Sequence, residues 1–283
     1  MNKKLIPTAI AIFCTMACSG SGVDDPAKKG KDDKKQEETV EIKSVPAELG
    51  LDSFYTKYVD ANGIPVVSSS KTSDKGVIEA RRLVTEMLKD VSPQVRLKLK
   101  ECKTYMIVMS KDEVTTDIPE YAYLKDDPET DWDQRARGLG GNEWYPYTCC
   151  AEENVLHLDN DRYYNEDITI HEFSHTIHNL GLAKAYSDFN DRLTKLYNDA
   201  KAAGKWANTY ADDNIEEYFA EGVQDWYDVN IEVANTNGIH NRVNTREELE
   251  RYDKGLYDFI AEFFEVPDEH FSNHPKVNLY NYE

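Results

Sequence analysis

The segment HEFSHTIH, which begins at His171, carries three histidines and a glutamate within little more than two helical turns. Each residue of a helix advances by about 100°. His171, His175 and His178 therefore share one face, while Phe173 and Ile177 fall on the opposite, apolar face. Two histidines one turn apart can bring a nitrogen each to a single Zn²⁺ at about 2.0–2.1 Å. The pattern predicts a metal-binding helix; the alternative is a set of histidines on a solvated helix face.

Glu172 follows the first histidine and points to the side of the pair His171 and His175, where its carboxylate can hold a metal-bound water without being a ligand. This is the HExxH pattern of zinc peptidases. A catalytic zinc also needs a third protein ligand and one open position. The metzincin extension would place a glycine and a histidine where this chain has His178 and Gly181, so the third ligand must come from another element.

A second predicted helix begins after Asn214 and supplies candidate third ligands. Its apolar residues recur at helical spacing and predict a buried stripe: Ile215, Tyr218, Phe219, Gly222, Val223 and Trp226. Glu217 and Glu221 lie one turn apart on the side away from the stripe, so either could reach the histidine helix. Glu216 lies nearer the edge of the stripe and is the poorer candidate. The alternative for this segment is an acidic, solvated helix face.

HEFSH followed by YADDNIEEYFAEGV resembles the gluzincins of the anthrax lethal factor family. The resemblance covers residues 171–223, about a fifth of the chain, and Ser174 replaces the glycine of the family pattern. It implies that Glu217 is the third zinc ligand and that Tyr210 donates a hydrogen bond in the transition state. The segments RARGLGG, EEN and HEFSHTIHNLGL are also similar to uncharacterised secreted zincin-like proteins. These resemblances imply a zincin-like metallopeptidase domain.

These observations predict a zinc metallopeptidase. Glu172 would accept a proton as the zinc-bound water attacks a peptide carbonyl, and Zn²⁺ with Tyr210 would stabilise the oxyanion. His178 is expected behind the metal ligands, bonded to Glu221 or to a backbone carbonyl; the alternative is a fourth ligand. Two other functions stay open: a zinc amide hydrolase acting on a non-protein substrate, and a non-catalytic surface binding lipoprotein on a zincin fold.

The remaining pattern predicts an α+β domain with a small mixed sheet in its first half and a helix-rich second half. The expected elements are a hairpin around Asn62-Gly63, a helix over 76–91, a strand over 104–110, a long loop over 115–150, a strand over 154–158, a helix from Tyr186 to near Gly204, and a helix that Thr245 and Glu248 cap and that ends before Pro267. The strand over 154–158 is the expected edge strand for an extended peptide.

Two arginines of the predicted loop are further candidates for the site. Arg135 and Arg137, with the glycines of RGLGG, would line the mouth of the cleft. The alternative is an ordinary loop anchored by salt bridges.

The N-terminus predicts export. Residues 1–17 combine two lysines, an apolar run and small residues, and TMAC resembles a lipobox that makes Cys18 a lipidated N-terminus, although Thr15 replaces an aliphatic residue. Residues 18–43 predict a disordered tether, and residues 44–283 the catalytic domain. We therefore expect a lipoprotein of the outer membrane or cell surface that contacts the membrane only through its anchor, the alternative being a plain secreted protein.

The charge and the cysteines set further bounds. The net charge of −20 disfavours nucleic acid and anionic lipid as partners. The partner expected from the predicted peptidase chemistry is a peptide or protein substrate. Cys14 is lost with the predicted signal and Cys18 is expected to be lipidated, which leaves three thiols. A disulfide from Cys102 to either Cys149 or Cys150 is expected in an oxidising compartment, with the third thiol unpaired. A cysteine zinc site is not expected, because adjacent cysteines lack the CxxC spacing.

Overall fold

The computed structural model describes residues 40–89 and 91–276. The predicted export signal, Cys18 and residues 18–39 of the predicted tether lie outside these ranges. Among the described residues, no helix is long and apolar enough to cross a membrane.

The packed chain begins within the segment predicted as tether. Val40 and Ile42 pack against the hydrophobic core, and Lys43 forms an isolated antiparallel bridge with Tyr58. These last residues of the predicted tether therefore belong to the folded unit.

All strands of the described chain lie in its first half, where helices alternate with them, and the second half is helical. The strands are β1 (Lys57–Ala61), β2 (Ile64–Ser68), β3 (Tyr105–Met109), β4 (Gly138–Leu139) and β5 (Tyr147–Ala151). Between and beside them lie α1 (Asp74–Leu88), α2 (Pro93–Glu101), α3 (Trp132–Arg135), α4 (Glu152–Val155) and the 3-10 helices η1 (Ala47–Leu49), η2 (Thr115–Asp117) and η3 (Pro119–Asp126). The second half contains α5 (Ile168–Thr176), the π-helix η4 (Ile177–Leu182), α6 (Ala183–Ala185), α7 (Phe189–Ala202), the 3-10 helix η5 (Tyr210–Asp212), α8 (Ile215–Trp226), α9 (Arg246–Tyr252) and α10 (Lys254–Ile260). The predicted α+β class is confirmed.

The five strands form one mixed sheet in the order β1-β2-β3-β5-β4. The predicted hairpin joins β1 to β2, and both turn residues have positive φ, 56° at Asn62 and 90° at Gly63, as the tightest hairpin turns require. β2, β3 and β5 run parallel, while β4 is antiparallel to β5 and forms an edge of the sheet.

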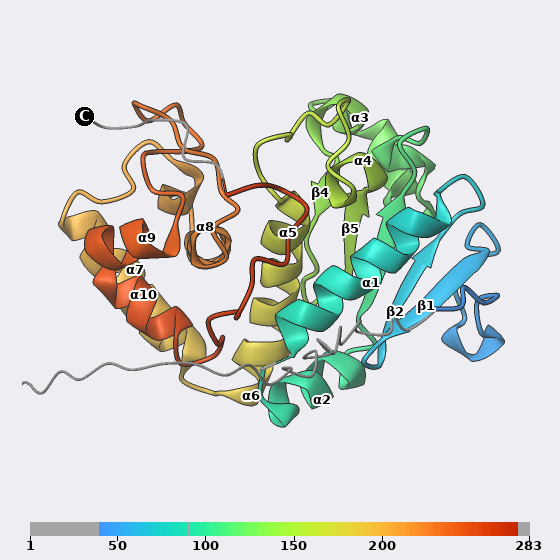
Figure 1. Ribbon diagram of the computed structural model, residues 1–283, viewed down its shortest axis with the longest axis horizontal. Helices are drawn as coiled ribbons and strands as arrows, with labels where there is room; N and C mark the ends of the chain where they lie inside the picture. The colour runs from blue at the N-terminus through green and yellow to red at the C-terminus, as the bar shows by residue number, and fades with distance from the viewer. Residues whose placement is uncertain (1–39, 90, 277–283) are drawn as a thin grey trace, which may run out of the picture. The chain divides into compact units, whose positions relative to one another are not determined.

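The sheet is covered on both faces. Met106 and Val108 of β3 belong to the larger core with α1 and α5, while Ile107 and Met109 belong to a second cluster with Tyr121. Figure 1 shows α1 across one face of the sheet and α5 between the sheet and helices α7 to α10. The histidine helix is therefore central to the fold.

Local signals explain where the two site-bearing helices start. The Asp167 side chain caps α5 by accepting hydrogen bonds from the backbone N–H groups of Thr169 and Ile170. The Asn214 side chain caps α8 by accepting from the N–H of Glu217. The apolar stripe that we predicted on α8 is buried except at its first residue, Ile215, which is partly buried, so the other side of this helix is free to face α5.

The predicted C-terminal helix is divided into α9 and α10. Thr245 caps the start of α9, as predicted, by accepting a hydrogen bond from the Glu248 N–H. The Glu248 carboxylate reaches back to the Asn244 N–H and the Thr245 hydroxyl, which differs from the capping-box bond to the Thr245 N–H. Asp253 interrupts the helix, because its backbone (φ −137°, ψ 74°) leaves the helical region. Its carboxylate accepts hydrogen bonds from Trp206 Nε1 and Tyr218 Oη.

Three other predicted elements correspond to α1, β3 and α7. No predicted element covered α2, although Ser92 caps it and Pro93 occupies its first turn, both of which are helix-start signals. The loop prediction over 115–150 was wrong in part, because this segment contains β4 and most of β5. All five residues of β5 are buried, so the strand lacks the polar alternation that would reveal it.

The strand prediction over 154–158 was also wrong. Residues 152–155 form α4, in which the Asn154 side chain donates hydrogen bonds to the Asp161 carboxylate and the Glu166 carbonyl and accepts one from the N–H of Ile168. These bonds tie the short helix to the start of α5. The edge strand of the sheet is β4 instead.

The expected disulfide is absent from the described part of the chain. Cys102, at the end of α2, and Cys149 and Cys150, in β5, are free thiols. Burial raises the pKa of Cys149 and of Cys150 well above the usual thiol range, which makes both unreactive.

Candidate metal centre

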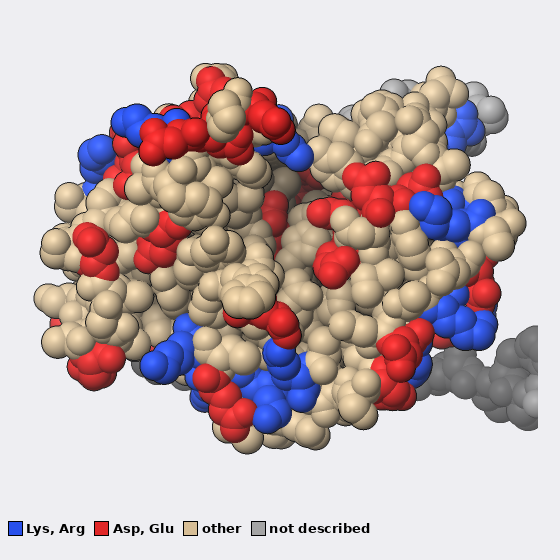
Figure 2. Space-filling view, turned by 180° about the vertical axis from the view of Figure 1, so that it is seen from behind, with Lys and Arg blue, Asp and Glu red and all other residues tan. Residues whose placement is uncertain are grey.

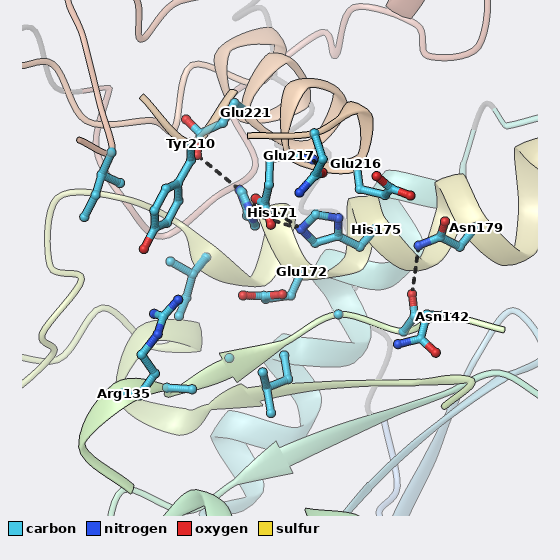
Figure 3. Close-up of a pocket in the computed structure, with 18 of the residues that line it drawn as sticks. Arg135, Asn142, His171, Glu172, His175, Asn179, Tyr210, Glu216, Glu217 and Glu221 are labelled. Carbon is cyan, nitrogen blue, oxygen red and sulfur yellow. Dashed lines mark hydrogen bonds and ion pairs between the residues drawn. The ribbon is translucent and has the colours of Figure 1, made fainter. Parts of the chain in front are cut away.

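Three side chains from two helices converge at the middle of a cleft. His171 and His175 project from α5, and Glu217 projects toward them from α8 (Figure 3). The Nε2 atoms of the two histidines are 3.1 Å apart; Glu217 Oε2 is 3.1 Å from the His171 nitrogen and 3.6 Å from the His175 nitrogen. The structure thus brings together the three residues that we predicted as metal ligands.

The spacing of these donor atoms suits a tetrahedral ion. Ligand atoms about 2.0–2.1 Å from a tetrahedral Zn²⁺ lie roughly 3.3–3.4 Å from one another. The observed separations of 3.1, 3.1 and 3.6 Å bracket that value. Imidazole nitrogen and carboxylate oxygen are donors that zinc accepts, and three protein ligands leave the fourth position open. The residues present therefore fit a catalytic zinc ion.

The electrostatics of the site also favour a bound cation. Burial opposes a charge on His171, but the hydrogen bond with Glu217 and the negative charges of Glu172 and Glu221 outweigh it and raise the pKa of His171 to about 10. Burial also opposes the charge on Glu217 and would raise its pKa. The contacts with His171 and His175 outweigh burial and hold the pKa of Glu217 well below the usual range. The surrounding carboxylates therefore stabilise positive charge between the two helices.

Gln224 of α8 fixes the orientation of His171. His171 Nδ1 lies 2.8 Å from Gln224 Oε1, so Nδ1–H donates and Nε2 is left to face the other ligands. Gln224 Nε2 in turn donates to the Asp167 carbonyl at 3.3 Å. We did not predict Gln224 from the sequence, although Glu217, Glu221 and Gln224 share one helix face at positions i, i+4 and i+7.

Glu221 lies beside the three ligands, not among them. Its Oε1 is 3.6 Å from His171 Nδ1, and its Oε2 accepts a hydrogen bond from Asn230 Nδ2 at 2.9 Å. The side chain is buried, and burial raises its pKa. Of the two glutamates that we considered as third ligand, Glu217 therefore has the ligand geometry.

Glu172 faces the edge strand of the sheet from α5. A Cβ at Gly138 would lie 2.9 Å from Glu172 Cγ, and one at Gly140 would lie 2.6 Å from His175 Cβ, so only glycine lets the segment after β4 lie this close to the helix. The Gly140 N–H hydrogen-bonds the Glu172 carboxylate, while burial raises the pKa of Glu172. The RGLGG segment is thus built around the general base that we predicted.

Tyr210 lies on the far wall of the cleft from Glu172 (Figure 3). It begins η5, and its backbone N–H donates to the Ile239 carbonyl at 2.9 Å, which joins two cleft-lining segments. The cleft has a volume of about 890 Å³ and is lined by His171, Glu172, His175, Glu217 and Tyr210 together. The structure therefore places all five predicted site residues in one cavity.

His178 does not take part in this site. It is fully buried, Nε2 bonds Asn190 Oδ1 at 2.9 Å, and its ring packs between Phe189 and Phe219. The prediction that it bonds Glu221 or a backbone carbonyl was wrong. The reason is that α7 and the apolar part of α8 cover the histidine face one turn beyond His175.

The remaining candidates separate into two groups. Glu216 and Arg135 line the cleft, but neither belongs to the converging ligands. Arg137 does not line the cleft: its buried guanidinium pairs with Glu153, Nε to Oε1 at 2.6 Å and Nη2 to Oε2 at 2.9 Å. Arg137 therefore anchors β4 to α4, which matches the salt-bridge alternative for this segment.

No family model matches the chain, and comparisons with curated proteins and with solved structures find no match.

Proposed function

We propose that the chain is a zinc-dependent peptidase of gluzincin type on a zincin-like fold, exported and anchored by lipid at Cys18. The observation that carries this proposal is the convergence of His171, His175 and Glu217 at zinc-like spacing, with a carboxylate, Glu172, beside them. A resident Zn²⁺ would be held by these three ligands, with Gln224 orienting the first of them.

Two features favour a catalytic centre over a structural one. The ligands lie in an open cleft and not in a closed shell, so a substrate can reach the fourth position of the metal. Glu172 is held in the same cleft by the Gly140 N–H, and a purely structural site has no use for this carboxylate. A binding lipoprotein with a structural metal accounts for neither feature.

When bound, the metal lowers the pKa of a coordinated water and polarises the substrate carbonyl. The Glu172 carboxylate accepts the proton of the attacking water and delivers it to the departing amide nitrogen. Burial raises the pKa of Glu172, which makes the carboxylate a better base than an exposed one. The Tyr210 hydroxyl, from the other wall, donates a hydrogen bond to the carbonyl oxygen as negative charge develops there.

The substrate is held by the edge strand β4. Gly138 and Leu139 line the cleft next to Glu172, and an edge strand offers backbone groups to which an extended peptide can add as a further strand. A peptide bound in this way would run between β4 and the metal ligands. This arrangement favours a peptide over a compact non-peptide amide.

The proposal is tested by incubating the purified chain with a library of end-blocked peptides and detecting new termini by mass spectrometry. We expect cleavage that a chelator abolishes, that added Zn²⁺ restores, and that Glu172→Gln reduces by about 10³-fold in kcat while zinc stays bound. Cleavage that persists in Glu172→Gln would contradict the proposed base. Zinc-loaded protein that cleaves no peptide would contradict the peptidase, and cleavage of amidated glycans alone would favour the non-protein amide hydrolase.

A further inference from the structure

One side of the cleft contains a carboxylate that the proposed chemistry does not use. Glu166 precedes the capping residue of α5 and lines the same cavity as the metal ligands. Its side chain is only 12 % exposed, and its backbone is fixed by a hydrogen bond from its N–H to the Tyr163 carbonyl and by one from Asn154 Nδ2 to its own carbonyl. The carboxylate is therefore held at a set position next to the catalytic centre.

Among the described residues, no lysine or arginine forms an ion pair with Glu166. The basic side chain paired with its carboxyl group is His240, with Nε2 3.6 Å from Oε1. Burial, and less strongly the nearby His171, lower the pKa of His240 to about 4, so His240 is neutral at neutral pH. Burial and the negative charge of Glu221 raise the pKa of Glu166 to about 8, although the nearby His171 opposes the rise. A cation that reaches this buried carboxyl group favours its ionised form and pairs with it.

His240 gives a second, independent sign of an incomplete site. Its side chain is 9 % exposed and lines the cleft, yet its Nδ1 has no hydrogen-bond partner among the described residues. Buried polar atoms are nearly always paired in folded proteins. The backbone next to His240 is fixed by the bond from the Tyr210 N–H to the Ile239 carbonyl, which keeps His240 on this wall of the cleft.

The surroundings of Glu166 suit a long side chain with a charged end. Tyr163, Ile168, Tyr210 and Ile239 line the cavity from the same segments that hold Glu166 and His240. Apolar walls can cover the methylene groups of lysine or arginine, while a carboxylate binds the ammonium or guanidinium group. Figure 2 shows acidic side chains inside the hollow of this face, which would attract a basic substrate.

We infer that the cleft contains a specificity subsite that takes a lysine or arginine side chain of the substrate next to the scissile bond. This subsite is formed by Glu166, Tyr163, Ile168, Ile239 and His240. The inference rests on the proposed peptidase function and adds the class of substrate. Glu216 also lines the cleft, but it belongs to α8 next to the polar capping residue Asn214 and not to the segments that hold Glu166 and His240. It therefore serves as the matched control.

The test measures binding as well as cleavage. End-blocked hexapeptides of alanine carry lysine, arginine, norleucine or glutamate at one central position, and their dissociation constants are measured by calorimetry on the zinc-loaded Glu172→Gln chain, which holds peptides without cutting them. We expect lysine and arginine peptides to bind at least about ten-fold more tightly than the norleucine peptide, as a charge-assisted hydrogen bond allows. Adding Glu166→Gln should reduce this ratio to below about three, and adding Glu216→Gln should leave it unchanged.

The two proposals fail separately. Equal binding of lysine and norleucine peptides, or a ratio that Glu166→Gln leaves intact, overturns the subsite, whether or not the wild type cleaves peptides. Selective binding of the lysine peptide that depends on Glu166, together with no cleavage by the wild type, supports the subsite and overturns the peptidase.

Discussion

The histidine helix has two ends that use the same residue type in opposite ways. In α5, His171 and His175 face a glutamate of α8 across an open cleft. One turn later, in η4, His178 is fully buried against aromatic rings and bonded to Asn190. The helix face is nearly continuous, but the elements packed against it differ. The role of each histidine is therefore decided by its neighbours and not by its place in the motif.

The largest effect should come from removing the ligand that α8 supplies to the α5 end. Glu217→Ala leaves two protein ligands, and we expect zinc affinity to fall by more than about 100-fold, beyond the effect of losing a group that only supports a ligand. Competition with a chromophoric chelator measures this affinity. Glu216→Ala, at the neighbouring position, should bind zinc as the wild type does; similar losses in both variants would contradict the ligand assignment.

A smaller effect is expected from the residue that orients His171. Gln224→Ala removes the acceptor 2.8 Å from His171 Nδ1, and we expect zinc affinity to fall about 10- to 100-fold. Gln224→Glu keeps an acceptor at this place and should recover part of the loss. If neither variant changes the affinity, Gln224 does not position the ligand.

The buried end of the helix, at His178, should affect how the stability of the fold depends on pH, and not the affinity for zinc. Burial lowers the pKa of His178 to about 4, whereas an unfolded histidine titrates near pH 6.5. Above pH 6.5 neither state binds the proton, so stability is unaffected. Between pH 6.5 and 4 the unfolded state binds it first, so His178 should cost up to about 3 kcal/mol of stability.

Denaturant unfolding of the wild type and His178→Gln at pH 7, 5.5 and 4.5 isolates this contribution, because other titrating groups are common to both proteins. The wild type should lose more stability than the variant as the pH falls. Parallel curves would show that His178 is protonated equally in the folded and unfolded states.

The sequence was sufficient for the parts of the site that lie within one helix or carry a local signal. His171, Glu172 and His175 follow from spacing in α5, and the choice of Glu217 followed from the periodicity of α8 and from a family resemblance. The hairpin at Asn62-Gly63 and the capped starts of helices were equally local. The coarse α+β class followed from these elements.

The parts that failed depend on contacts between distant segments. β5 is buried on both faces and so resembles no amphipathic strand, which hid the edge strand β4 that pairs with it. Arg137 lies two residues after Arg135, yet one is buried against Glu153 and the other lines the cleft. Glu166 and His240 are separated by more than seventy positions and meet only in the folded chain. No periodicity in the sequence could predict these contacts.

Zinc binding at the α5 end of the helix is tested most directly by measuring zinc content. Mass spectrometry measures the zinc content of the purified wild-type chain, His175→Ala and His178→Gln. The account predicts one zinc per chain in the wild type and in His178→Gln, and a marked loss in His175→Ala, because only the α5 end of the helix faces Glu217. A wild type that takes up no zinc, or a loss in His178→Gln as large as in His175→Ala, would contradict it.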